Sequence, residues 1–222
     1  MLPADPEFAS LKDRLLTMSS LAMTATRKAV KSLLDRDDDL ARAVDHEDSQ
    51  IDDLEKDIDE LCITLLSRAP LASDLRMIAV AMKITHDLER VGDEAAVIAR
   101  RAVRLNTEPQ LKEYIDLPRM AQMALDMLKD ALDAFVDRDV TKARDIPPRD
   151  NEVDALNGQI QRELASYMAE NAANITRALH LIEITKRIER IADHATNIAE
   201  QIMFLLEGRD VRHAPRPGSV PA

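Results

Sequence analysis

Residues 84–93 of the chain read ITHDLERVGD, and residues 184–193, 100 positions later, read ITKRIERIAD. Two earlier blocks repeat at an offset of 102: DSQIDDL at 48–54 matches DNEVDAL at 150–156, and DRD at 35–37 matches DRD at 137–139. Three blocks that recur in the same order indicate a tandem duplication. The change of offset means that two residues are missing from the second copy, between its middle and last segments.

Each copy is predicted to form three helices, because its apolar residues recur at spacings of three and four. In the first copy the apolar stripes run from Leu11 to Leu33, from Ile51 to Leu65 and from Met77 to Ala102. In the second copy the first helix covers Met120 to Phe135, and the later helices begin near Asp150 and Ile175. Breaks are expected at the acidic turn 35–39, at Ala69-Pro70 and at Pro147-Pro148, since the residue before a proline avoids the helical region.

The predicted fold is therefore all-α, with two tandem three-helix bundles related by internal duplication. The first bundle is expected at residues 7–105 and the second at residues 119–207. Residues 208–222 are Pro-rich and unpatterned, which predicts a disordered C-terminal tail. Aromatic residues make up only 2% of the chain and there are four glycines, a composition that favours long helices over sheets.

Net charge, hydrophobicity and cysteine content limit the expected partners and cellular location of the protein. A net charge of −11 argues against a nucleic-acid partner, which needs a basic surface. Membrane insertion is not expected, because no apolar run approaches the roughly 20 residues needed to cross a bilayer. The first residues lack the basic start and apolar centre of a secretory signal. Cys62 is the single cysteine and is expected to act as a small buried hydrophobe, which fits a reducing, cytoplasmic location.

Paired acidic residues are the feature of the repeat that packing does not require. Four pairs stand at positions i and i+4, two in each copy: Asp48/Asp52, Glu89/Asp93, Asp150/Asp154 and Glu189/Asp193. Residues four apart share a helix face, where like charges cost a few tenths of a kcal/mol. A hard cation shared by the carboxylates reverses the sign of that interaction. Asn197, one turn after Asp193, is placed to add a carbonyl oxygen.

A helical wheel at about 100° per residue indicates where the acidic pairs point. In the third helix of each copy the pair lies about 150° from the middle of the apolar stripe, and in the second helix about 120°. The carboxylates are thus expected on the outside of each bundle, or in a groove between its second and third helices. His194 lies about 140° from Glu189 and is expected at a surface or interface, and the other histidines show no ligand spacing.

Two other interpretations of the acidic pairs stay open. They belong either to a structural helical protein whose acidic face is simply solvated, or to a carboxylate-bridged metal enzyme such as an iron oxidase. The enzyme interpretation is weakened because Glu-x-x-His pairs are absent, and because His46-Glu47 is followed by Gln50, not by the second histidine of a zinc protease. No nucleophile–base pair, Gly-rich phosphate loop or cysteine cluster is found either, so the chain is not expected to be an enzyme.

Three segments together are similar to the PhoU family of phosphate-specific transport accessory and regulatory proteins. They are PLASDLR at 70–76, LERVGD at 88–93 and IERIADHATNIAE at 188–200. The resemblance covers the chain from about Leu11 to Leu206. It implies a cytoplasmic negative regulator of phosphate uptake and phosphate-starvation signalling. Such a protein acts as an adaptor between the ATPase of a phosphate ABC transporter and a sensor histidine kinase, and often as a homodimer.

The resemblance also implies divalent or multinuclear metal sites. Carried over by position, the ligands of one site are Asp48, Asp52, Glu89 and Asp93, and those of the other are Asp150, Asp154, Glu189 and Asp193, with Asn197 added. Fe, Mn, Mg or Zn are the candidate metals, and all-oxygen ligands favour the harder ions. The first copy departs from the pattern because Val97 stands where the second copy has Asn197. The second site is therefore expected to bind metal better.

Overall fold

The computed structural model describes residues 6–68 and 71–208, which form helices and no strand. The helices are α1 (Pro6–Leu34), α2 (Asp38–Leu66), α3 (Ala72–Asn106), α4 (Asp116–Asp137), α5 (Val140–Arg144), α6 (Pro147–Glu170), the 3-10 turn η1 (Ala172–Asn174) and α7 (Ile175–Glu207). The predicted all-α fold with an internal duplication is confirmed. Residues 209–222 of the expected tail, Ala69-Pro70 and residues 1–5 lie outside the described part.

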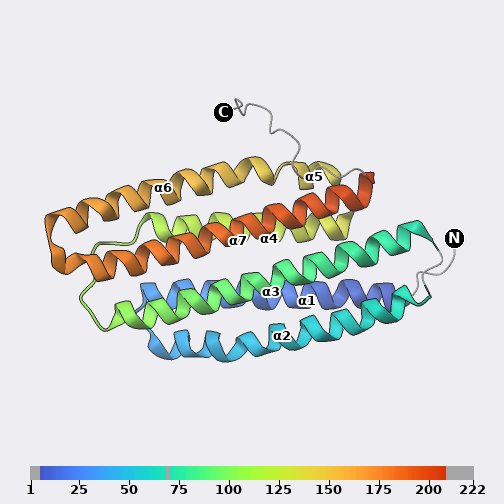
Figure 1. Ribbon diagram of the computed structural model, residues 1–222, viewed down its shortest axis with the longest axis horizontal. Helices are drawn as coiled ribbons and strands as arrows, with labels where there is room; N and C mark the ends of the chain where they lie inside the picture. The colour runs from blue at the N-terminus through green and yellow to red at the C-terminus, as the bar shows by residue number, and fades with distance from the viewer. Residues whose placement is uncertain (1–5, 69–70, 209–222) are drawn as a thin grey trace.

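The helices form two bundles that lie side by side (Figure 1). α1, α2 and α3 pack against one another in the first, and α4, α6 and α7 do so in the second. α3 and α7 form the main contact between the bundles, with a smaller contribution from α1 and α4. Among the described residues, every helix is too short or too polar to span a membrane.

Cys62 and the apolar stripes fill the cores as expected. Leu11, Ile58, Ile84 and Ile188 are completely buried, and so is Cys62. Burial raises the pKa of the Cys62 thiol to about 11, so the thiol stays protonated and unreactive.

The repeated Asp-Arg-Asp block builds the turn after the first helix of each copy. Arg36 and Arg138 adopt a left-handed conformation, with φ of 56° and 54°. The next residues, Asp37 and Asp139, are the N-caps of α2 and α5, and their carboxylates accept backbone hydrogen bonds from the first turn of the helix. Both copies thus keep the left-handed turn residue and the N-cap that follows it.

Pro147 and Pro148 explain why the second copy has an additional short helix. In the first copy α2 is continuous, whereas in the second copy the equivalent segment is split into α5 and α6. α6 begins at Pro147, three residues before the predicted start at Asp150. A proline fits the first turn of a helix, where its missing N–H has no partner to lose, but it interrupts a helix that arrives from the preceding residues.

The interface between α3 and α7 is antiparallel, and the polar pairs across it follow the repeat. As the residue number rises in α3, the partner in α7 falls. The pairs are Lys83–Gln201 at 3.2 Å, Asp87–His194 at 2.8 Å, Glu94–Arg187 at 3.0 Å and Arg101–Glu183 at 2.6 Å. The offset of 100 converts the first pair into the last and the second into the third. The two bundles are therefore related by an approximate two-fold axis near the middle of the two helices.

Candidate metal centre

Three of the predicted ligands lie close together along the line where α2 packs against α3, here called the first groove. Asp48 and Asp52 lie on α2, and Asp93 faces them from α3. Burial raises the pKa of Asp48 to about 6, and the negative charges of Asp52 and Asp93 add to the shift. Gly92 lets the helices approach here, since a Cβ at this position would lie 3.0 Å from Asp48 Oδ1 and 2.8 Å from Ile51 Cδ1. The groove thus concentrates carboxylates that repel one another.

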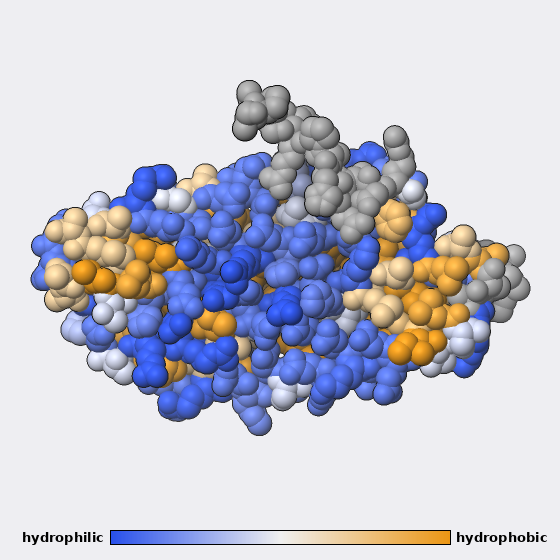
Figure 2. Space-filling model, in the orientation of Figure 1, coloured by the Kyte–Doolittle hydropathy of each residue, from blue (hydrophilic) through white to orange (hydrophobic). Residues whose placement is uncertain are grey.

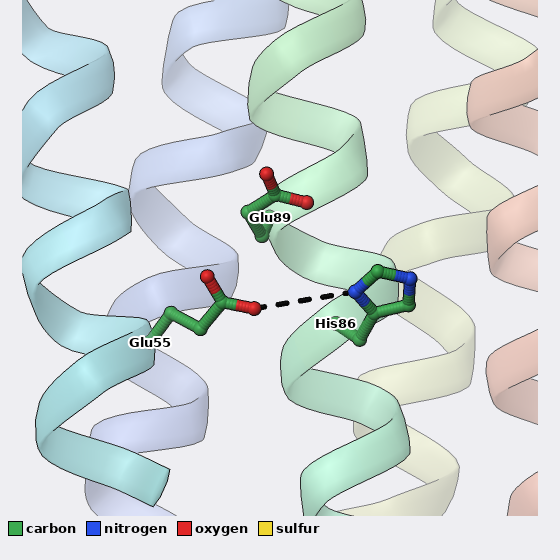
Figure 3. A group of neighbouring side chains, drawn as sticks. All are labelled: Glu55, His86 and Glu89. Carbon is green, nitrogen blue, oxygen red and sulfur yellow. Dashed lines mark ion pairs between the residues drawn. The ribbon is translucent and has the colours of Figure 1, made fainter.

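A second group lies two turns along the same groove. Glu55 of α2 points across to His86 and Glu89 of α3 (Figure 3). One ligand atom from each of these side chains lies within 4.8 Å of the others, and His86 Nδ1 is 4.0 Å from Glu55 Oε1. Only Glu89 of this group was predicted from the sequence. The other two could have been found from their spacing. Glu55 follows Asp48 by seven residues and His86 precedes Glu89 by three, so each lies on the acidic face of its helix.

The electrostatics of the second group also favour a bound cation. Burial raises the pKa of both Glu55 and Glu89, and neighbouring carboxylates raise them further, chiefly Asp59 beside Glu55 and Asp93 beside Glu89. Glu89 Oε2 is buried and accepts no hydrogen bond among the described residues, although Arg90 Nε lies 3.4 Å from it. A buried carboxylate oxygen without a hydrogen bond is costly, and a cation would satisfy it.

The donor set fits a metal ion. Two ligands on opposite sides of a cation lie roughly 4 to 5 Å apart, twice the metal–oxygen bond length, which agrees with the spread of Glu55, His86 and Glu89. Carboxylate oxygens suit Mg, Mn and Ca, and an imidazole nitrogen extends the range to Fe and Zn. The group is open to solvent at His86, whose side chain is 60% exposed. All three side chains come from α2 and α3, the second and third helices of the first bundle.

The corresponding groove between α6 and α7 is less acidic. Burial raises the pKa of Glu189, and the charges of Asp154 and Asp193 raise it further, but a hydrogen bond from Asn157 opposes the shift, as does the charge of Lys186. The side-chain oxygen of Asn157 accepts from Gln161 at 3.0 Å, so its amide nitrogen is left to donate to Glu189.

Two predicted ligands of the second copy lie in surroundings that the sequence did not indicate. Asp150 is only 3% exposed, in the first turn of α6, and does not lie on the outside of the bundle. Asn197 lies at the bundle interface, where its Nδ2 is 3.5 Å from Asp87 Oδ1. The contact with Asp87 engages Nδ2 of Asn197 and not the carbonyl oxygen that was expected to bind metal.

The two copies differ at the positions that sequence reasoning missed. The offset of 102 places Asn157 at the position of Glu55, and the offset of 100 places Lys186 at the position of His86. The first groove therefore gains a carboxylate and an imidazole where the second has an amide and an ammonium. This difference favours metal binding by the first groove, opposite to the expectation based on Val97 and Asn197.

Two sequence comparisons relate the chain to known proteins. The sequence profile described as "PhoU domain" matches residues 15–102 and 117–202. A relative from Pseudomonas aeruginosa, named phosphate-specific transport system accessory protein PhoU homolog, is 40% identical over 209 residues, which are 93% of this chain and 86% of the relative.

Two crystal structures resemble the chain over nearly its whole length. PhoU from Pseudomonas aeruginosa has a TM-score of 0.89 and 38% identity, covering 92% of this chain and 99% of that one. The phosphate transport system regulatory protein PhoU from Streptococcus pneumoniae has a TM-score of 0.85 and 28% identity, covering 93% and 98%.

Proposed function

Because the chain belongs to the PhoU family, we propose that it is a negative regulator of phosphate uptake and of phosphate-starvation signalling. Its relatives are named phosphate-specific transport accessory and phosphate transport regulatory proteins, which supports a role in the regulation of phosphate transport. One observation carries the proposal: both copies match the family domain, and together they align with 99% of a PhoU chain of known structure.

The proposed mode of action is that of a cytoplasmic adaptor between a phosphate transporter ATPase and a sensor histidine kinase. Apolar side chains gather at the two ends of the molecule and leave a hydrophilic middle (Figure 2). One end has Ile63, Leu66, Leu71 and Leu75 exposed, around the turn from α2 to α3; the other end has Ile115, Ile175 and Leu179 exposed, around the start of α7. Two separate apolar surfaces suit a protein that contacts two partners, or one partner and a second copy of itself in a homodimer.

A divalent or multinuclear metal bound in the carboxylate grooves is part of the proposal. When bound, the cation supplies positive charge that neutralises the repelling carboxylates of α2 and α3. Asp48, Asp52 and Asp93 would hold it at one end of the first groove, and Glu55, His86 and Glu89 at the other. In the second bundle, Asp150, Asp154, Glu189, Asp193 and Asn197 remain the proposed ligands. The first groove is proposed as the tighter site, because it has His86 at the position where the second groove has Lys186.

We propose a regulator and not an enzyme, since the open groove offers one exposed histidine and no enclosed ligand cage. A ferroxidase assay with the iron-loaded chain separates the two. Turnover of Fe(II) that is lost in the variant with Glu89→Ala and Asp93→Ala would favour the metal-enzyme alternative.

Deletion of the gene tests the regulatory role. Loss of the protein is expected to make phosphate-starvation genes constitutively active and to deregulate phosphate uptake. Wild-type protein supplied in trans should restore repression, and a Leu71→Asp/Leu75→Asp variant should fail to do so if that end contacts a partner. A Ser20→Asp variant, changed at an exposed position in the middle of α1 and away from both apolar ends, controls for added charge. An unchanged starvation response in the deletion strain would contradict the proposal.

A further inference from the structure

A hollow outside the carboxylate grooves lies on the interface between the bundles. It encloses about 430 Å³ and is lined by Val97, Arg100, Arg101, Arg104, Glu183 and Arg187. Four guanidinium groups thus meet one carboxylate in a chain whose net charge is −11. α3 supplies three of the arginines and α7 supplies the fourth, so both bundles build the hollow.

Carboxylates beneath the hollow fix two of its arginines. Glu183 accepts from Arg101, with Oε2 2.6 Å from Nε and Oε1 3.1 Å from Nη2. Glu94, only 6% exposed, accepts from Arg187 at 3.0 Å and from Arg190 at 3.3 Å. Arginines held in this way are oriented in advance, so they lose little conformational freedom when a ligand binds.

The other two arginines keep most of their hydrogen-bonding capacity. A guanidinium carries five N–H donors. Arg100 gives one hydrogen bond to Asp45, at 2.5 Å, and the Arg104 side chain gives none within residues 6–68 and 71–208. Around the hollow the nearby carboxylates are Glu183, Glu94, Asp45 and Asp48, and with Arg190 the guanidinium groups number five against these four. The hollow therefore has solvent-facing donors that no group of the described residues engages, and excess positive charge.

The approximate two-fold axis relates this hollow to an equivalent one, which shows whether the packing of α3 against α7 requires the arginines. The equivalent hollow, of about 420 Å³, is lined by Met82, Lys83, His86, Asp87, Asn197 and Gln201. Asn197 replaces Val97 there, Gln201 replaces Arg101, and Asp87 replaces Arg187. The second hollow keeps the same interface with a balanced set of charges. Packing of α3 against α7 therefore does not require an arginine cluster, which is a property of one side only.

We propose that this arginine hollow binds a small multivalent phosphate anion, namely a free phosphate or a diphosphate group. Guanidinium groups match phosphate oxygens through paired, charge-assisted hydrogen bonds. Val97 is the single apolar residue of the lining, and no aromatic ring contributes to it. The hollow thus offers nothing on which a nucleotide base could stack, so the recognised part of the ligand is the phosphate itself.

An anion bound here contacts both bundles at once. Arg100 and Arg104 would hold it from α3 and Arg187 from α7, so binding would strengthen the contact between the copies. The inference does not rest on the proposed regulatory role, because it follows from the lining residues alone. Its failure would leave that role and the carboxylate grooves untouched.

Isothermal titration calorimetry of the full chain tests the proposal. The protein is first treated with a chelator, so that phosphate cannot bind through a metal in the grooves. Inorganic phosphate and pyrophosphate are then titrated separately at constant ionic strength. At least one is expected to bind with a dissociation constant below about 1 mM. Tighter binding of pyrophosphate would assign a diphosphate group, and equal binding would assign a single phosphate.

Matched arginine variants locate the binding. Arg104→Gln is expected to weaken binding about tenfold, as for the loss of a charged hydrogen bond, and adding Arg100→Gln about tenfold more. Arg119→Gln is the control, because Arg119 is exposed on α4 and lines a different hollow. Unchanged circular dichroism would show that the variants are folded. The absence of saturable binding to either anion, or equal weakening by Arg119→Gln and Arg104→Gln, would overturn the proposal.

Discussion

His194 of α7 lies 2.8 Å from Asp87 of α3, at the place where the other half of the interface holds Glu94 against Arg187. The duplication kept the contact and exchanged its chemistry: an acid on α3 meets an imidazole in one half and a guanidinium in the other. Glu94 is the more buried acid, and it accepts hydrogen bonds from two arginines of α7.

Replacing Glu94 is expected to weaken the interface. Glu94→Gln leaves Arg187 and Arg190 without their shared carboxylate and should lower the free energy of unfolding by about 1–3 kcal/mol. Glu60→Gln, at an exposed position of α2, should change it by less than about 0.5 kcal/mol. Urea unfolding of both variants measures the difference. Equal stability of the two variants would mean that the Glu94 contacts contribute nothing to folding.

Metal retention should depend on the acidic pairs of each bundle separately. Changing Glu89 and Asp93 to Ala is expected to remove metal from the first groove, and changing Glu189 and Asp193 to Ala should remove it from the second. The first variant should lose more metal, because the second groove contains Asn157 and Lys186.

Elemental analysis of the purified variants measures the metal content, and far-UV circular dichroism should show almost unchanged helicity. Asp53→Ala with Asp57→Ala is the matched control, since these two exposed residues of α2 have the same i, i+4 spacing. Full metal content after loss of Glu89 and Asp93 would remove these residues from the proposed ligands.

The raised pKa of Asp48 predicts how the stability of the protein varies with pH once a chelator has removed any bound metal. Its pKa is about 6 in the fold against 3.8 for the unperturbed group, so the folded state binds more protons between these values. The contribution of Asp48 to stability therefore falls as the pH rises from about 4 to about 6.

An Asp48→Asn variant isolates this contribution. It should be more stable than wild type near neutral pH in the presence of chelator, and the advantage should vanish below the unperturbed pKa. Thermal unfolding across the pH range measures it, with Asp53→Asn as the control for loss of one charge. A difference from wild type that does not vary with pH would refute the electrostatic account of the groove.

The two left-handed arginines offer a matched comparison. Arg36 Nη2 donates to the carbonyl oxygens of Asn106 at 2.6 Å and Glu108 at 2.7 Å, whereas the Arg138 side chain makes no such bond within the described ranges. Arg138→Gly should leave the free energy of unfolding nearly unchanged. Glycine adopts the left-handed conformation without strain, and this gain offsets its greater conformational freedom in the unfolded chain. Arg36→Gly should cost about 1–2 kcal/mol, owing to the lost hydrogen bonds. Calorimetric unfolding compares the two, and equal effects would exclude a role for the Arg36 side chain.

The fold could be predicted from the sequence because its information is local and repeated. The spacing of Ile84, Leu88 and Val91 fixes a buried helix face, and the same pattern at Ile184, Ile188 and Ile191 fixes its copy. α5 was not predicted, because a five-residue helix is too short to show a period. Its start nevertheless had a visible signal in the repeated N-cap, Asp37 and Asp139.

The candidate metal centre could be predicted only in part. Spacing along one helix identified Asp48 and Glu89, but the position of α2 relative to α3 decides which side chains meet. That position brings Glu55 and His86 together, a contact that no single-helix pattern contains. The contact of Asn197 with Asp87 could not be predicted for the same reason, because Asp87 belongs to the other bundle.

The antiparallel register of α3 and α7 has a mechanical consequence. Sliding one helix by a single turn moves each side chain about 5.4 Å along the axis, and that displacement separates Lys83 from Gln201 and Arg101 from Glu183 in the same movement. Intermediate offsets would leave charged groups opposite the wrong neighbours. The two halves of the molecule can therefore be seated only in discrete positions, and any signal that shifts one half against the other must do so in a step and not by gradual drift.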